Sequence, residues 1–238
     1  MNGQAGPGSR GTILLTTGDT GTFFYRELSR YPASRFPNLP PNPSVPPGAE
    51  KVVGELIDAL VTDGFLAVEL AWDGQGLWDE PGGPRTMVCR FATVARWVYD
   101  NLHAGGARTL FAAQGTSGGA SMIAFALAHY GLDEILDLAN LCGGPPQCPR
   151  CDGRGELAET LLNGNPRLNY PGTHVRFFIG EDDPYPAAFD GMNTFFNAIT
   201  SAKTKQVIPP VTLHRVEGSE AGKEALLAAI KEAAAALR

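Results

Sequence analysis

A serine flanked by glycines is the residue of this sequence best placed to do chemistry. The run Gly115-Thr116-Ser117-Gly118-Gly119 follows an apolar stretch that predicts a buried strand, 108–114, and precedes one that predicts a buried helix, 120–130. A serine on so tight a strand-to-helix turn is strained, and its hydroxyl stands clear of the sheet as a nucleophile. The backbone N–H of Gly118, at the helix N-terminus, is then placed to meet a developing oxyanion. The other interpretation is a glycine-rich turn with an incidental serine.

A nucleophilic serine needs a base, and the base needs an acid that orients it. The histidines of the chain are His103, His129, His174 and His214. Downstream of the serine, the acidic run Glu181-Asp182-Asp183 follows the apolar stretch 174–180, which predicts another strand. In a parallel sheet the end of that strand lies at the carboxyl edge, which is also the edge that carries Ser117.

Strands and helices are predicted to alternate along the chain. The predicted strands are 11–16, 64–72, 108–114, 135–142, 174–180 and 207–216, the last with its true start near Val211, and the predicted helices are 49–62, 86–102, 120–130, 188–201 and 220–238. This order predicts an α/β fold: a doubly wound, mostly parallel sheet with helices on both faces, in one domain over residues 1–238. Two long loops interrupt it, a Pro-rich loop at 31–48 and a Cys-containing, cap-like loop at 143–170.

The sequence resembles the α/β-hydrolase superfamily over nearly its whole length. The features that carry the resemblance are the first strand with its glycine loop, the serine turn (the nucleophile elbow of that superfamily), the acidic loop, the last strand and the terminal helix. The resemblance implies a serine esterase or lipase-like hydrolase. Such an enzyme cleaves an ester-type bond through an acyl-enzyme on Ser117 and needs no cofactor.

The same resemblance implies roles for two loops. Gly180-Glu181-Asp182-Asp183-Pro184 looks like the acid loop of the superfamily and makes Asp183 the orienting acid, with Asp182 as the alternative. An acidic turn that caps the strand is the non-catalytic interpretation. After the first strand, the main-chain N–H of Asp19 or Thr20 would complete the oxyanion hole with Gly118; a plain strand-to-helix turn is the other interpretation.

The base does not stand where the superfamily keeps it. The expected place is between the last strand and the last helix, where Ala221 occupies the position of the histidine. His214 falls inside the predicted last strand, and the other histidines are expected to be structural. Three explanations are open: the strand ends early and His214 is the base; Ala221 replaces a catalytic histidine and the enzyme is impaired; or the chain is a non-catalytic binding protein that retains the pocket.

The charge and the apolar content of the sequence limit the classes of partner that the chain is expected to bind. The net charge of −6 argues against nucleic acid or an anionic membrane as the main partner. No apolar run reaches the roughly 18 residues of a transmembrane helix, and residues 1–10 lack the apolar core of a signal peptide. The expected partner is a small ester-like molecule. A cytoplasmic location is expected, or secretion if the cysteines form disulfides.

The cysteines are Cys89, Cys142, Cys148 and Cys151. Their number is compatible with two disulfides or with free thiols. Cys148-Pro149-Arg150-Cys151 resembles one half of the zinc knuckle of J-domain chaperones, but one half supplies only two thiolates, so zinc would also need Cys142 and Cys89 or a histidine. Disulfides or free thiols are therefore favoured, and no metal site is predicted.

Overall fold

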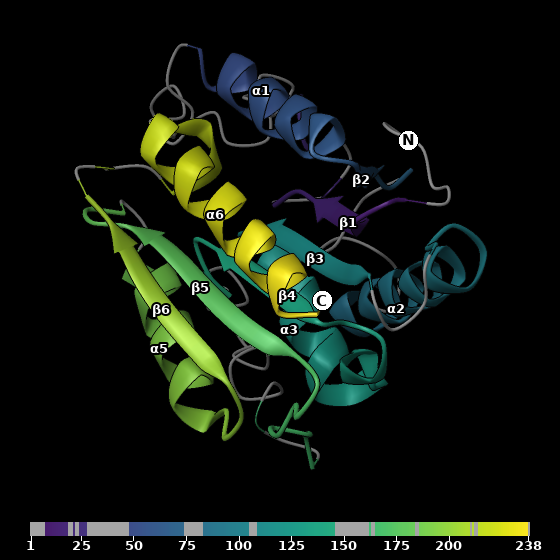
Figure 1. Cartoon of the computed structure of the whole chain (residues 1–238). Coiled ribbons are helices and arrows are strands. Elements are labelled where there is room, and N and C mark those ends of the chain that lie inside the picture. The colour runs from purple at the N-terminus through teal and green to yellow at the C-terminus, as the bar shows by residue number, and fades with distance from the viewer. Residues whose placement is uncertain are drawn as a thin grey trace.

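Six parallel strands form one sheet in the described part of the chain. The computed structural model describes residues 8–18, 21, 24–27, 48–73, 83–104, 109–145, 162, 165–183, 186–209, 211 and 214–237. The strands are β1 (Gly11–Thr16), β2 (Phe65–Leu70), β3 (Leu110–Thr116), β4 (Leu138–Cys142), β5 (His174–Gly180) and β6 (Lys203–Ile208). Their order across the sheet is β2-β1-β3-β4-β5-β6, and every neighbouring pair is parallel (Figure 1). The predicted α/β class with a doubly wound sheet is confirmed.

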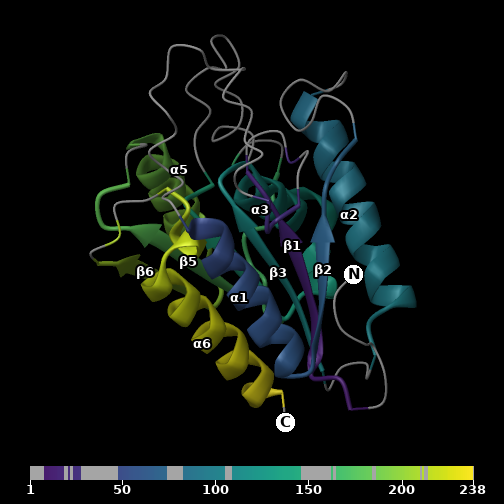
Figure 2. The same cartoon turned by 90° about the horizontal axis from the view of Figure 1, so that it is seen from above.

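Helices cover both faces of the sheet. They are α1 (Ala49–Thr62), α2 (Gly83–Asn101), α3 (Gly118–Tyr130), α5 (Pro186–Ala198) and α6 (Glu220–Ala236), with short 3-10 helices η4 (Leu132–Glu134) and η5 (Val216–Gly218). Figure 2 shows α1 and α6 side by side on one face and α2, α3 and α5 on the other. The chain reaches both faces because helices α1, α2, α3 and α5 form the crossovers from β1 to β2, from β2 to β3, from β3 to β4 and from β5 to β6, as is usual between parallel strands.

Alternation along the strands divides the buried apolar residues into two layers. Leu14, Phe111 and Ala113 pack with α2, α3 and α5, whereas Leu15 and Ala112 pack with α1 and α6. Successive side chains of a strand point to opposite faces, so a central strand buried on both sides is apolar at nearly every position.

Most predicted elements are observed within a few residues of their predicted bounds. The strands at 11–16 and 174–180 and the helix at 49–62 coincide with β1, β5 and α1. The predicted last strand at 207–216 is wrong. β6 ends at Ile208, and Pro209, which follows, has no N–H to give to a sheet.

The physical reason for that error is the edge position of β6. Its residues 204–207 are exposed, so the strand is mostly polar and carries no apolar signal. The apolar signal comes instead from the connection after the strand, where Val211 and Val216 are buried against α1 and α6. The apolar residues of a loop that packs into the core thus resemble those of a strand.

Several features named from the sequence lie outside the described residues. These are the Pro-rich loop up to residue 47, most of the loop at 143–170 with Cys148 and Cys151, and the oxyanion candidates Asp19 and Thr20. Cys89 is exposed and Cys142 is buried, and both are free thiols, so the interpretation with two disulfides is wrong. In the described ranges no three His, Cys, Asp or Glu side chains are grouped to hold a metal ion. No helix within those ranges is long and apolar enough to cross a membrane.

Candidate active site

The turn between β3 and α3 holds Ser117 in a strained backbone conformation. Ser117 has φ 53° and ψ −116°, a region that residues with a side chain rarely occupy. The serine lies at the carboxyl edge of the sheet, between the last residue of β3 and the first helical residue, Gly118. The N–H of Gly118 is among the first four of α3, which have no partner within the helix. This N–H and the positive end of the helix dipole are available to a negative charge beside Ser117.

The glycines around Ser117 are required by close backbone contacts. A Cβ at Gly115 would lie 2.6 Å from the carbonyl carbon of Gly119, and a Cβ at Gly119 would lie 2.7 Å from the carbonyl oxygens of Thr16 and Thr17. Both distances are shorter than any real Cβ contact. The glycines therefore allow α3 to start directly against β3 and against the loop that follows β1.

The loop after β1 runs alongside the serine. A Cβ at Gly18 would lie 2.6 Å from Cβ of Ser117 and 3.3 Å from its Oγ. β1 pairs with β3, so the loop is the one expected to supply a second oxyanion donor. Its candidate donors, Asp19 and Thr20, lie beyond the described residues, but the adjoining Gly18 brings the main chain to the serine hydroxyl.

His214 and Asp183 form a buried pair at the same edge of the sheet. Nδ1 of His214 lies 2.8 Å from Oδ2 and 3.1 Å from Oδ1 of Asp183. The two residues are 7% and 8% exposed. Asp182, the alternative acid, is exposed. A proton on Nδ1 that is donated to the carboxylate leaves Nε2 as the basic nitrogen of a neutral imidazole.

The position of His214 follows from the early end of β6. The histidine lies in the connection between β6 and α6, which is where the resemblance expects a base, and not inside a strand. Ala221 lies in the first turn of α6 and packs against the apolar cluster under that helix. Sequence reasoning missed the pairing of His214 with Asp183 because it extended the strand through the histidine.

The last residue of β4 and the residue that follows it contact both halves of the site. The N–H of Ser117 donates to the carbonyl of Cys142 at 2.9 Å. The next residue, Gly143, has φ 56°, and a Cβ there would lie 3.1 Å from Nδ1 of His214 and would also collide with the histidine carbonyl oxygen. Only a glycine fits between the serine turn and the imidazole. No role of Gly143 is predicted from the sequence. Its position directly after a predicted strand is the one local feature that could have indicated such a role.

Glu217 is a second residue that sequence reasoning did not assign. It lies on η5, three residues beyond His214, and it is fully buried. Oγ1 of Thr116 donates to Oε1 of Glu217 at 2.7 Å. Burial raises the pKa of Glu217, while Arg215, the Thr116 hydrogen bond and His214 act in the opposite direction. A carboxyl group thus lies directly behind the serine turn.

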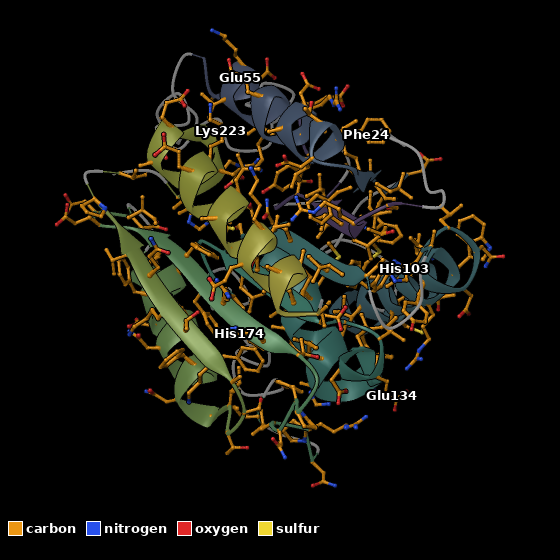
Figure 3. The ribbon with its side chains drawn as sticks, in the orientation of Figure 1. Phe24, Glu55, His103, Glu134, His174 and Lys223 are labelled. Carbon is orange, nitrogen blue, oxygen red and sulfur yellow. The ribbon has the colours of Figure 1, made fainter. Side chains whose placement is uncertain are left out.

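The other histidines lie at the opposite edge of the sheet. His103 is hydrogen-bonded to Thr12 at 3.2 Å and to Thr109 at 3.3 Å, near the starts of β1 and β3. His174 is the first residue of β5, and burial together with Arg176 lowers its pKa. Figure 3 shows His103, in the connection after α2, apart from His174 on β5. His129 lies near the end of α3, which runs away from the serine.

The helix that follows the His214 connection is tied to its neighbour. Nζ of Lys223 on α6 donates to Oε2 of Glu55 on α1 at 2.7 Å, and Figure 3 shows the two side chains next to each other. Ser219 caps α6, since its Oγ accepts the N–H of Gly222 at 3.0 Å. These contacts fix the start of α6 and, with it, the end of the segment that carries His214.

Comparisons with known proteins support the architecture. No protein-family model matches the sequence, and no curated protein matches it. Solved structures are similar in fold. The highly thermostable carboxyl esterase from Bacillus coagulans has a TM-score of 0.62 at 12% identity, over 97% of this chain and 92% of that chain.

Two further solved structures are similar to this chain in fold. The Bacillus cereus carboxylesterase has a TM-score of 0.54 at 17% identity, over 98% of this chain and 92% of that chain. The monoacylglycerol lipase of Paleococcus ferrophilus has a TM-score of 0.57 at 11% identity, over 98% of this chain and 96% of that chain. With its parallel sheet, serine turn and element order, the chain has the α/β-hydrolase fold.

Proposed function

We propose that this chain is a serine hydrolase that cleaves a small ester through an acyl-enzyme on Ser117. The observation that carries the proposal is the buried pair of His214 and Asp183, at the same sheet edge as a strained serine. The serine, the carboxylate and the imidazole follow one another along the chain as Ser117, Asp183 and His214, which is the order of α/β hydrolases. The similarity in fold to carboxylesterases and a lipase supports an ester as the substrate class.

In the proposed reaction, Nε2 of His214 takes the proton of the Ser117 hydroxyl as its Oγ attacks the ester carbonyl carbon. The carbonyl oxygen becomes an oxyanion, which accepts the N–H of Gly118 and a main-chain N–H of the loop after Gly18, that of Asp19 or Thr20. When the intermediate collapses, the imidazolium gives its proton to the departing alkoxide, and the acyl group stays on Oγ. Water, activated by the same imidazole, then attacks the acyl-enzyme and releases the acid.

Asp183 has two tasks in this scheme. Its hydrogen bonds to Nδ1 hold the ring in one orientation and in the tautomer that leaves Nε2 unprotonated. Its charge then stabilises the imidazolium that forms after proton transfer. Every proton in the cycle is moved by protein groups and water, so the proposal includes no cofactor.

A fluorophosphonate probe tests the nucleophile directly. We expect the probe to label the wild-type protein on Ser117, identified by peptide mass spectrometry, and to leave Ser117→Ala unlabelled. The matched control is Ser9→Ala, which removes a hydroxyl that donates to the carbonyls of Gly11 and Gly64, at the other edge of the sheet. This variant should label like wild type.

Hydrolysis of p-nitrophenyl acetate and butyrate gives the second readout. Wild type and Ser9→Ala should release nitrophenol at the same rate, whereas Ser117→Ala should lose activity by about a thousandfold or more. The rival is a non-catalytic protein that retains the pocket. It predicts no labelling and no hydrolysis by wild type, and that result would reject the proposed function.

A further inference from the structure

The hydrogen bond between Thr116 and Glu217 joins two segments that lie far apart in the sequence. Thr116 is the last residue of β3 and directly precedes Ser117, and Glu217 follows His214 by three residues. The bond is 2.7 Å long, and both side chains are fully buried. One contact therefore connects the strand that ends in the serine to the segment that carries the histidine.

The surroundings of Glu217 are unusually polar for the interior of a sheet. Next to Thr116 on the same face of β3, Nε2 of Gln114 donates to the hydroxyl of Tyr25 at 2.9 Å, and Nδ2 of Asn140 donates to Oε1 of Gln114 at 3.2 Å. These side chains are 0–1% exposed. Burial raises the pKa of Tyr25, and the nearby carboxylate of Glu217 raises it further. This polar layer lies between the carboxyl half of β3 and β4 and the chain segments that cover it.

Burial of the carboxyl group of Glu217 at this position is energetically unfavourable. Oε2 of Glu217 is buried and has no hydrogen-bond partner among the described residues. Burying a polar atom without a partner costs free energy, and an apolar side chain of similar volume would serve packing at least as well. The hydrogen bond to Thr116 is directional, whereas apolar contacts are not. The carboxyl group of Glu217 therefore contributes a fixed relative position of the two segments that it joins, and not additional packing.

We propose that Glu217 is a positioning residue that holds the His214 segment in register with the end of β3 and so aligns the imidazole with Ser117. Glu217 does not contact substrate; it acts through Thr116 and through the backbone of η5. The inference rests on the proposed function, since it assigns a role in the same reaction. It predicts that loss of the hydrogen bond lowers the rate of the chemical step and leaves substrate binding unchanged.

Three variants test the inference: Glu217→Gln keeps an acceptor oxygen for Thr116, Glu217→Leu removes it, and Thr116→Val removes the donor with almost no change of volume. We expect Glu217→Leu and Thr116→Val to lower kcat for p-nitrophenyl butyrate by about tenfold or more at unchanged KM, because small displacements of reacting groups strongly lower the rate of the chemical step. Glu217→Gln should restore kcat to within about threefold of wild type. The double variant Glu217→Leu with Thr116→Val should be no slower than the slower single variant, since both substitutions remove the same hydrogen bond.

The matched control is Thr12→Val, which removes another fully buried strand threonine, one that bonds to His103 at the far end of the sheet. Its kcat should equal that of wild type. If Glu217→Leu fails to fold, Thr116→Val alone decides. A kcat within threefold of wild type in Thr116→Val, or an equal loss in Thr12→Val, overturns the positioning role while wild-type hydrolysis stands. Absence of hydrolysis by wild type is a different result and overturns the proposed function together with this role.

Discussion

Nδ1 of His214 lies 2.8 Å from Oδ2 of Asp183, although the two residues follow different strands, β6 and β5. The two strands are parallel neighbours, so their carboxyl ends meet, and the short turn at Asp183 and the longer connection at His214 close on each other. Both side chains are almost fully buried, which shields the hydrogen bond from water and fixes the ring. The imidazole is oriented before any substrate arrives.

The first prediction concerns this pair. Asp183→Asn should lower kcat/KM for an ester by about a hundredfold to ten-thousandfold, because an amide can donate to Nδ1 and hold the ring in the wrong tautomer. Steady-state kinetics with p-nitrophenyl butyrate measure the effect. Asp182→Asn is the control, since Asp182 is the exposed neighbour in the same turn. Equal losses in the two variants would mean that the acidic turn, and not the pair, supports activity.

The second prediction decides which residue is the base. His214→Gln should reduce kcat by about a thousandfold or more, because the proton acceptor for Ser117 is lost. Ala221→His should bring no gain, since position 221 lies in the first turn of α6 against an apolar cluster. Rates of ester hydrolysis for both variants provide the measurement. A large increase in Ala221→His, with His214→Gln unaffected, would assign the base to position 221.

Much of the fold could be predicted from the sequence because buried parallel strands and their helices carry strong periodic signals. β1, β5 and α1 are such elements, and their predicted bounds agree with the structure. β6 could not be predicted in the same way, because an edge strand with exposed polar residues has no such pattern. For that reason the predicted strand includes His214, whereas in the structure His214 lies in the connection after β6.

The candidate site was predictable in part for a related reason. Ser117 carries a local signal, since Gly115 is required by the close approach of Gly119 within the same turn. The pairing of His214 with Asp183, the fit of Gly143 against the imidazole and the bond from Thr116 to Glu217 each join segments distant in the sequence. Such contacts depend on how the connections fold, and local spacing does not contain that information.

The third prediction concerns Gly143. Gly143→Ala should lower kcat by about tenfold or more, because the added Cβ would collide with the carbonyl of His214 and press on its ring. It should also lower the free energy of unfolding by about 1 kcal/mol or more, since φ is 56° at this position. Urea unfolding and steady-state kinetics give the two quantities.

Gly54→Ala is the matched control for that variant. Gly54 lies within α1, and a Cβ there meets no atom within 4 Å. This substitution should raise the free energy of unfolding by about 0.5–1 kcal/mol, because alanine favours a helix interior over glycine, and it should leave kcat unchanged. Wild-type activity in Gly143→Ala would show that the imidazole is not held by the segment after β4.

The fourth prediction concerns pH and the stability of the fold. Burial raises the pKa of Glu217 above the ordinary value of 4.5, so the folded protein holds this proton more tightly than the unfolded chain. Between those two pKa values the unfolded chain is ionised while the folded protein is not, so the contribution of Glu217 to stability falls as pH rises from about 4.5. Glu217→Gln removes this dependence. The free energy of unfolding of the variant, minus that of wild type, should therefore increase with pH.

The groups that act on Glu217 remain in both proteins. Arg215 and His214 belong to the same segment as Glu217. Tyr25 lies in the segment 24–27, and Cys142 is the last residue of β4. Burial raises the pKa of both Tyr25 and Cys142, so neither changes its charge between pH 4 and 8. Urea unfolding at intervals across that range measures the difference, with Glu224→Gln, an exposed glutamate of α6, as the control. A difference that stays flat or declines as pH rises would contradict the raised pKa of Glu217, because an acid that ionises less readily in the folded state must weaken the fold as its proton is removed.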